Sequence, residues 1–201
     1  MAQAKKKKKF FEVDIPIIKK QTQLQAYESK ELEGRYIEYD LTRMLRGKSM
    51  LIQLKVKIEN EETTTIPTQI KLMPYFLRRM LRKGTNYIED SFSTNCKDAQ
   101  IKIKPFLITR RKVPRSIRKA LREKSKEEII KYVKTKESEK LFNEVLKNIL
   151  QKTLSLKLKK IYPLSLCEIR IMKVEKFLEN KKQVSEKTKS IKPKEEIEKE
   201  E

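Results

Sequence analysis

The sequence predicts an α+β fold, with a sheet formed mainly by the first half of the core and helices formed by the second half. Three observations support this. Apolar residues alternate at period two in several runs between residues 35 and 109, as they do in half-buried strands. Between residues 114 and 163 they recur instead at the spacing of amphipathic helices. After Pro163 a strand-like alternation returns.

Three strands are expected before residue 74. The first, residues 35–41 (RYIEYDL), places Ile37, Tyr39 and Leu41 on one side. The second is the strongest strand signal in the chain, because five apolar residues share one face and polar residues share the other. These apolar residues are Met50, Ile52, Leu54, Val56 and Ile58. The third, residues 63–73, has an inward face formed by Ile66, Ile70 and Leu72.

A short helix is expected next, because Pro74 suits a first helical turn and Gly84 suits a C-terminal cap. Its inward stripe comprises Phe76, Leu77, Met80 and Leu81, and its outer face comprises Arg78, Arg79, Arg82 and Lys83. A strand at residues 100–109 follows, with Ile101 and Ile103 on one face. Pro105 within it indicates an edge strand or a bulge.

The helical half begins at Pro114. Ser125 and Glu128 have the spacing of a capping box, which predicts that a new helix starts there. A broad apolar stripe then combines Leu141, Val145 and Ile149 with Phe142, Leu146 and Leu150, and Pro163 ends the region. The last expected strand, residues 166–178, alternates Cys167, Ile169 and Ile171 against Glu168 and Arg170.

The composition is strongly basic: 201 residues carry 50 Lys and Arg against 28 Asp and Glu, a formal net charge of +22. A body with that charge repels itself and is expected to bind a polyanion, of which nucleic acid is the main candidate. We expect a disordered basic arm at residues 1–9, one domain at residues 10–179, and a disordered Lys/Glu tail at residues 180–201. The arm contains Lys5, Lys6, Lys7, Lys8 and Lys9, which we expect to contact the polyanion and to become ordered on binding it.

Several function classes are disfavoured by the sequence. No apolar run reaches the roughly 18 residues of a membrane span, and none near the start resembles a secretory signal, so we expect no membrane partner and a cytoplasmic protein. Cys96 and Cys167 are then expected to be free thiols. The chain has no His, and its adjacent acidic pairs (residues 89–90 and 127–128) do not form a catalytic set. We therefore expect no enzyme activity, no metal site and no cofactor.

The most basic segment is LITRRKVPRSIRKALREK, residues 107–124. Its connection carries Arg110, Arg111 and Lys112, and the helix after Pro114 carries Arg115, Arg118, Lys119 and Arg122 on one face, opposite Ile117, Ala120 and Leu121. Guanidinium groups match phosphate oxygens, so we interpret this segment as a phosphate-binding surface. The alternative is a solvated charged face. Secondary contacts with the nucleic acid are expected from Arg35, Arg78, Arg79 and Arg82. Aromatic residues among the strands are more typical of a core than of base stacking.

Four stretches taken together resemble one family: FFEVDIP at 10–16, LEGRYIEYDL at 32–41, ITRRKVPRSIRKALREK at 108–124 and IYPLSLCEIRIMKVEKF at 161–177. In this order they resemble the S-three-A-e family of small-subunit ribosomal proteins of archaea and eukaryotes, over residues 10–178. The family usually has a longer basic stretch and a Trp before the aromatic opening, whereas this chain has Phe10 and Phe11 there and no Trp.

The resemblance implies a β-barrel-like sheet core with packed helices and no catalytic activity. It also implies a place on the platform of the small subunit, near the mRNA exit. The expected partners are small-subunit ribosomal RNA, neighbouring platform proteins and, near the exit, mRNA. Our main hypothesis is therefore a structural constituent of the small ribosomal subunit that binds ribosomal RNA through its basic surfaces. The alternative is a free regulatory protein that binds single-stranded RNA.

Overall fold

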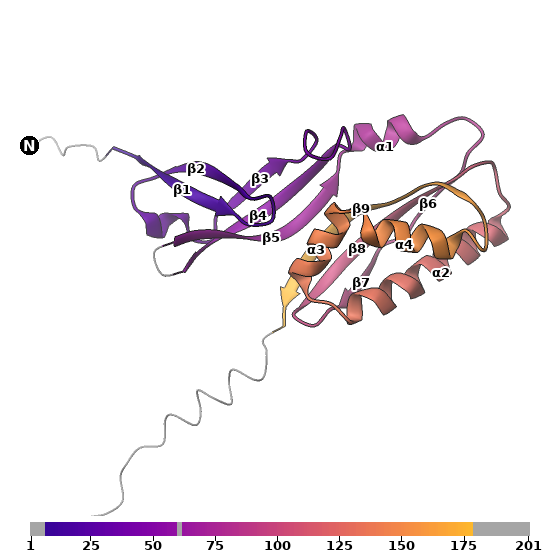
Figure 1. The fold of residues 1–201 in the computed structure, drawn as a ribbon. Helices are drawn as coiled ribbons and strands as arrows, with labels where there is room; N and C mark the ends of the chain where they lie inside the picture. The colour runs from indigo at the N-terminus through magenta and orange to yellow at the C-terminus, as the bar shows by residue number, and fades with distance from the viewer. Residues whose placement is uncertain (1–6, 60–61, 179–201) are drawn as a thin grey trace, which may run out of the picture.

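The structure is a computed structural model that describes residues 7–59 and 62–178 (Figure 1). Within these ranges it contains a nine-stranded sheet, four α-helices and one short 3-10 helix. The strands are β1 (Lys9–Ile15), β2 (Lys20–Ala26), β3 (Tyr36–Asp40), β4 (Met50–Glu59), β5 (Glu62–Leu72), β6 (Tyr87–Glu89), β7 (Phe92–Asn95), β8 (Ala99–Thr109) and β9 (Leu164–Phe177). The helices are η1 (Ser29–Leu32), α1 (Pro74–Met80), α2 (Arg115–Lys134), α3 (Ser138–Leu146) and α4 (Ile149–Leu158).

The sheet follows the order β2-β1-β5-β9-β8-β6, with β4 joining β3 to β5, and β7 pairing with β8. All strand pairs are antiparallel except β1 with β5. Strands β1 to β5 form one end of the molecule, and β6 to β9 with helices α2 to α4 form the other (Figure 1). The prediction of a mixed α and β domain is confirmed.

A closed barrel is not confirmed, because the sheet is open between β2 and β3 in the described residues. Two side-chain hydrogen bonds span this opening. Lys20 Nζ donates a 3.1 Å hydrogen bond to the Tyr39 hydroxyl, and Arg35 Nη1 donates a 3.0 Å hydrogen bond to the Gln25 carbonyl. The first five strands therefore curve toward one another without completing a hydrogen-bonded ring.

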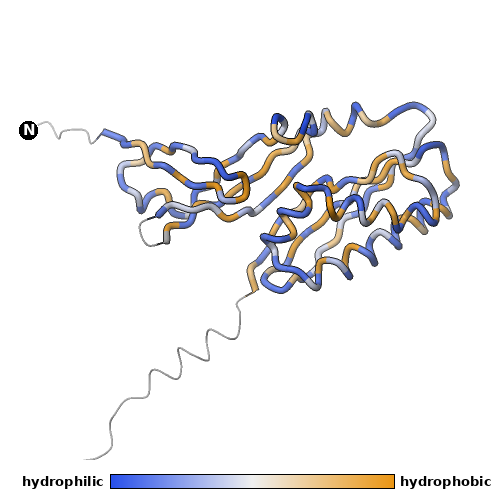
Figure 2. Tube along the Cα trace, in the orientation of Figure 1, coloured by the Kyte–Doolittle hydropathy of each residue, from blue (hydrophilic) through white to orange (hydrophobic). Residues whose placement is uncertain are grey.

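One apolar core runs through both ends of the molecule. Its largest fully buried side chains include Phe106 on β8, Phe142 on α3 and Met50 on β4. Hydrophobic and hydrophilic residues alternate along the strands in Figure 2, as expected for a sheet with one face covered. Helices α2, α3 and α4 pack on the sheet and on one another, and α4 lies against β9.

The five predicted strands are all present, but two of their inward-facing residues were wrong. Ile66 is only half-buried, because Thr68 is an extra residue opposite the Gln53–Leu54 step and this β-bulge reverses the alternation of β5. Thr65 and Pro67 therefore face inward before the bulge. Ile171 is displaced in the same way by a bulge at Arg170, and Met172 takes the buried position.

Pro105 lies at that second irregularity, opposite Ile169, so the bulge indicated by the sequence is present and the edge strand is not. The central strand β8 tolerates a residue without an N–H at this point. On its other side β7 pairs only up to Ile103 and β6 begins pairing at Phe106, so Pro105 falls in the gap between the two short strands.

Helix α1 is shorter than predicted. It ends at Met80, and Leu81 adopts an extended conformation and is partly exposed instead of completing the inward stripe. Phe76 and Leu77 alone are buried. Gly84 does have the positive φ of a capping glycine, +84°, but it belongs to a separate turn closed by the Thr85 N–H and the Arg82 carbonyl.

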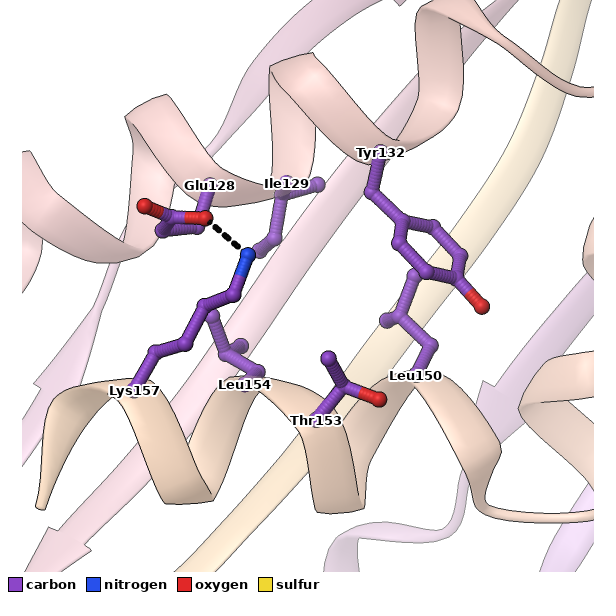
Figure 3. Close-up of a pocket in the computed structure, with 7 residues that line it drawn as sticks. All are labelled: Glu128, Ile129, Tyr132, Leu150, Thr153, Leu154 and Lys157. Carbon is purple, nitrogen blue, oxygen red and sulfur yellow. Dashed lines mark hydrogen bonds and ion pairs between the residues drawn. The ribbon is translucent and has the colours of Figure 1, made fainter.

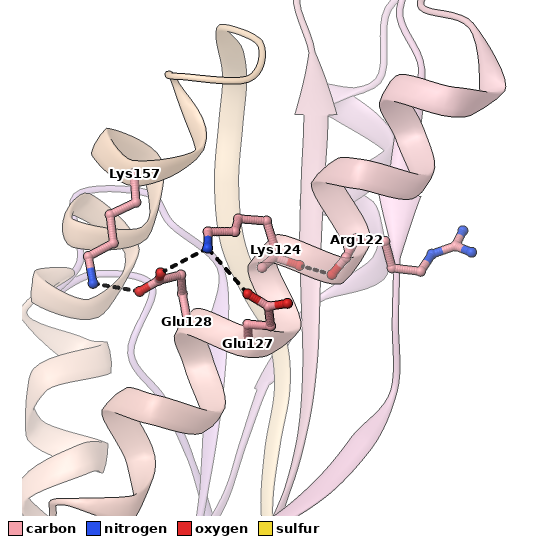
Figure 4. A network of polar contacts seen from close by, with 6 residues as sticks. Arg122, Lys124, Glu127, Glu128 and Lys157 are labelled. Atoms are coloured by element: carbon pink, nitrogen blue, oxygen red, sulfur yellow. Dashed lines mark hydrogen bonds and ion pairs between the residues drawn. The ribbon is translucent and has the colours of Figure 1, made fainter.

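Helix α2 is continuous through the predicted break at Ser125, so the capping-box prediction was wrong. Ser125 is buried in line with Leu121 and Ile129, and this stripe holds the helix against the sheet on both sides of it. The Ser125 hydroxyl donates to the Arg122 carbonyl, 2.9 Å away, and caps no free N–H. Glu128 instead bonds to Lys157 of α4, at 2.6 Å (Figure 4).

The predicted apolar stripe from Leu141 to Leu150 is divided between two helices. Asn148 has a left-handed backbone (φ 58°) that ends α3 and turns the chain into α4. Leu141 and Val145 are buried as predicted, but Ile149 lies after the turn and is exposed.

The predicted arm and tail fall largely on residues 1–6 and 179–201, which lie outside the described residues. Lys9, predicted to belong to the arm, is the first residue of β1.

Candidate nucleic-acid interface

Three connections meet at one end of the molecule, the end at which β8 finishes and β9 begins (Figure 1). They are residues 81–86 before β6, residues 110–114 between β8 and α2, and residues 159–163 between α4 and β9. Together they expose seven cations, which we call the basic end: Arg82, Lys83, Arg110, Arg111, Lys112, Lys159 and Lys160.

Thr109 and Asn86 hold these connections together. The Thr109 N–H donates to the Asn86 carbonyl at 2.9 Å, and the Asn86 side-chain oxygen accepts from the Val113 N–H at 2.9 Å. The Thr109 hydroxyl lies 2.7 Å from the Arg111 carbonyl, to which it donates. Thr109 also pairs with Leu164 in the ladder, which brings the third connection alongside. The main chain that presents these cations is therefore held at fixed points.

The basic end is not neutralised within the described part of the chain. None of its seven cations forms an ion pair with a described residue. Lysines elsewhere do find partners, such as Lys140 with Glu137. Unpaired cations at one end create a positive potential that attracts a polyanion.

Helix α2 continues this positive surface from its first turn. Arg115, Lys119 and Arg122 are exposed, and Lys119 has only a weak pair with Glu123, at 3.8 Å between two exposed side chains. Arg118 is half-buried, and its Nε is buried without a hydrogen-bond partner. Ala120, predicted to lie on the apolar face, is exposed, so that face is narrower than expected.

A second group of cations surrounds α1. Arg79 stacks on the Phe76 ring, 5.5 Å from its centroid, and its Nη2 lies 3.5 Å from the Gly47 carbonyl. That contact brings the β3–β4 turn beside α1 and adds exposed Arg43 and Arg46 to the predicted Arg78 and Arg79.

The remaining predicted residues lie elsewhere. Arg35 contacts Gln25 and Glu31 near β2, away from the basic end. Lys7 and Lys8 precede β1 at the opposite end of the molecule, where Lys8 lies over the Tyr27 ring. The structure therefore brings together residues 82 and 110–122, but not Arg35 or the described lysines of the arm. Lys5 and Lys6 lie outside the described residues.

Five further cations were not among the predicted contacts: Arg43, Arg46, Lys83, Lys159 and Lys160. Lys83 directly follows the predicted Arg82. The pair Lys159–Lys160 directly before Ile-Tyr-Pro was a usable signal, because a connection between a helix and a strand is exposed. Arg43 and Arg46 carried no signal of this kind, since their position beside α1 depends on the tertiary fold.

Among residues 7–59 and 62–178, no three Cys, Asp or Glu side chains gather in a way that could hold a metal ion. The cavity between α2 and α4, lined by residues such as Ile129, Leu150 and Leu154, encloses about 10 Å³, which is room for about one water (Figure 3). No helix in the described ranges is long and apolar enough to cross a membrane.

The two cysteines are free, and Cys96 is buried. Burial, followed by the neighbouring Glu168 carboxylate, raises the pKa of the Cys167 thiol to about 12. This thiol is consequently a poor nucleophile at neutral pH.

Comparison with known proteins gives a consistent result. A relative from Nanoarchaeum equitans, named small ribosomal subunit protein eS1, is 28% identical over 167 residues, covering 79% of this chain and 84% of the relative. A protein of the same name from Pyrobaculum aerophilum is 28% identical over 164 residues, covering 79% of this chain and 74% of the relative. The profile of the Ribosomal S3Ae family matches residues 2–177, nearly the whole chain. The chain therefore belongs to the Ribosomal S3Ae family.

Proposed function

We propose that this protein is a structural constituent of the small ribosomal subunit and that its basic end and the adjoining face of α2 bind ribosomal RNA. The observation that carries the proposal is the set of seven exposed cations, none paired within the described chain, on three connections held together by Thr109 and Asn86. Family membership and the names of the archaeal relatives support the ribosomal role.

The cations of the basic end are better suited to binding phosphates than to recognising base edges. Arginine guanidinium groups donate to phosphate oxygens in pairs, and such contacts position a protein on RNA without reading its sequence. Arg43, Arg46, Arg78 and Arg79 form a second, smaller contact surface. A position on the platform near the mRNA exit is part of the same proposal.

The direct test is the salt dependence of binding to small-subunit ribosomal RNA. The triple variant Arg110→Ala, Arg111→Ala, Lys112→Ala should make the negative slope of log K against log salt shallower by about 2 to 3. Each lost phosphate contact reduces the magnitude of this slope by about 0.7–0.9. A matched control neutralises three exposed lysines on the far half of the same helix: Lys126, Lys131 and Lys134. If the slope decreased equally in both variants, or did not decrease in the Arg110, Arg111 and Lys112 variant, docking through the basic end would be contradicted.

The alternative is a free regulatory protein that binds single-stranded RNA. Sedimentation of a host lysate on sucrose gradients separates the two. Co-migration with small subunits that persists at moderate salt supports the structural role. A pool that remains mostly at the top of the gradient supports the alternative.

A further inference from the structure

We propose that the outer face of β4 and β5, beside the end of β9, binds the base of an unpaired RNA nucleotide. This groove encloses about 300 Å³, within the range of small-ligand sites, and its lining includes Glu33, Lys55, Lys57, Ile66, Thr68 and Phe177. It lies at the far end of β9 from the basic end. The inference rests on the proposed function, since it gives the bound RNA a second contact of a different kind.

The groove continues a row of side chains across three strands. Lys55 pairs directly with Tyr36 on β3 and with Ile66 on β5, so these three side chains share one face of the sheet. Phe177, at the end of β9, closes the row beside Ile66. Each of the two aromatic side chains leaves more than half of its surface exposed, Tyr36 60% and Phe177 53%. A row of aromatic, cationic, aliphatic and aromatic groups is the composition of a base-stacking platform.

Packing does not explain why these rings are exposed. Burying a Phe side chain stabilises a protein in proportion to the apolar area removed from water, and Phe177 leaves about half of its area exposed. The other described Phe side chains are at least half-buried, except Phe10 on β1. A base stacked on Phe177 would cover both its own face and that of the ring.

At β4 the main chain leaves no free edge for a peptide strand. Lys55 is paired on both sides, and Val56 exchanges hydrogen bonds with the chain before β3, through the Gly34 N–H (3.0 Å) and the Arg35 carbonyl (2.8 Å). A peptide therefore cannot add as a further strand to this part of β4. A nucleobase binds to the faces of side chains, so the pairing of the β4 main chain does not prevent its binding.

The charges at the rim favour a nucleotide that enters from one side. Lys55 and Lys57 are exposed, and the Lys55 side chain extends over Gly34. Among the described residues that line the groove, Glu33 is the one carboxylate, so the sugar-phosphate chain should follow the lysine side. Thr68 adds a hydroxyl near the floor, although it already donates to the Gln53 carbonyl at 3.0 Å.

The experiment uses the absence of tryptophan in this chain. Phe177→Trp in the full-length protein introduces a single fluorophore at the groove. A matched control, Ile149→Trp, introduces one at an exposed helix position outside the groove and outside the proposed RNA contacts. Each variant is titrated with a short oligoadenylate and with an RNA duplex of equal charge. We expect the single strand to quench the Phe177→Trp emission, with the same midpoint as binding measured by anisotropy, and to leave the Ile149→Trp emission unchanged.

A second variant gives the energetic readout. Phe177→Ala should weaken single-strand binding roughly 5- to 100-fold with an unchanged salt slope, because stacking and not charge is lost. It should leave duplex binding unchanged. Single-strand affinity within twofold of the parent protein would overturn the inference, as would equal quenching of both Trp variants. Blue-shifted Phe177→Trp emission that RNA does not alter would mean that protein covers the groove, and would also overturn it.

These outcomes are separable from failure of the proposed function. If Phe177→Ala has no effect while the basic-end variant still lowers the salt slope, only the groove inference fails. If the parent protein binds neither RNA nor the small subunit, both fail.

Discussion

Lys48 and Glu168 form the most buried ion pair among the described residues, with side chains 11% and 13% exposed. Lys48 Nζ lies 2.6 Å from a Glu168 oxygen and 2.6 Å from the side-chain oxygen of Asn148. The amide of Gln151 approaches the same Glu168 oxygen at 3.4 Å. The pair joins the β3–β4 turn to β9 and to the left-handed turn between α3 and α4, across 120 positions of sequence.

Replacing Glu168 by Leu should destabilise the protein strongly. Removing one partner of a buried pair leaves a buried, uncompensated charge and costs about 3–5 kcal/mol. Because Lys48 keeps its bond to Asn148 and some solvent contact, we expect the lower end, about 3 kcal/mol. For a domain of this size, that lowers the Tm by roughly 6–12 °C. Adding Lys48→Met should restore most of the loss, since the second buried charge is then also removed.

Thermal and urea unfolding followed by circular dichroism would measure both effects at neutral pH. The matched control is Glu123→Leu, which breaks the exposed pair with Lys119 and should change stability by less than about 1 kcal/mol. A cost for Glu168→Leu no greater than that of the control would refute the reasoning. So would a double variant as unstable as the sum of the two single changes.

Three further predictions follow from local geometry. Burial raises the pKa of Cys167 to about 12, against 9.0 for a free thiol, so its thiolate fraction near pH 8 is about 1,000-fold lower than that of a free thiol. Mass spectrometry after iodoacetamide treatment should therefore find Cys167 unmodified in the folded protein. Modification at the rate of a free thiol would contradict this. The hydrogen bond from Lys157 lowers the pKa of Glu128 below 4.5, so its contribution to stability is complete above that pH and is lost as pH falls through the lowered value. Glu128→Gln should therefore cost up to about 1 kcal/mol at pH 7 and nothing at strongly acidic pH in urea unfolding; equal costs at both pH values would exclude the ion pair as the cause. Lys19 has a φ of 56° in the β1–β2 turn, so Lys19→Gly should raise stability by up to about 1 kcal/mol, and a lower Tm would show that no strain is stored there.

The strands predicted from the sequence were those with a buried and a polar face over many residues. Met50 to Ile58 is the clearest case, because five apolar residues match one face of β4. Strands β6 and β7 were not predicted, since three or four residues cannot display an alternation. Strand β2, KQTQLQA, has only two apolar side chains, Leu24 and Ala26, and its assignment depends on pairing with β1.

The helices show where local signals compete with packing. Ser125 and Glu128 have the spacing of a capping box, yet a helix continues wherever its buried stripe continues, and the stripe runs on through Ile129 and Val133. The α3–α4 break was invisible for the opposite reason. Asn148 is polar and tolerates a left-handed backbone, but the residues on both sides keep a helical spacing, so only the observed turn ends the stripe.

The candidate site was predicted in part. The segment from Arg110 to Arg122 is recognisable because its charge is local, and the start of α2 at Arg115 follows from Pro114. The convergence of three connections is not a local property. Residues 82, 110 and 160 meet because β8 lies between β6 and β9 in the sheet. A sequence pattern within one segment cannot predict this strand order.

The groove beside Phe177 depends on the β-bulge in β5 that places Ile66 on the opposite face from the one predicted. A regular β5 would place Ile66 on the same face as Ile70, in the core, and leave Lys55 without an apolar neighbour outside. The extra residue at Thr68 reverses the alternation and puts Ile66 on the outer face, beside Lys55 and Phe177. Bulges interrupt pairing, so each one left in a central strand reduces the hydrogen bonding of the sheet. Natural sequences break local rules mainly at functional or strained sites. The bulge at Thr68 is therefore evidence for a use of this face, and Thr68 deletion should abolish single-strand quenching at residue 177 while leaving the salt slope of the basic end intact.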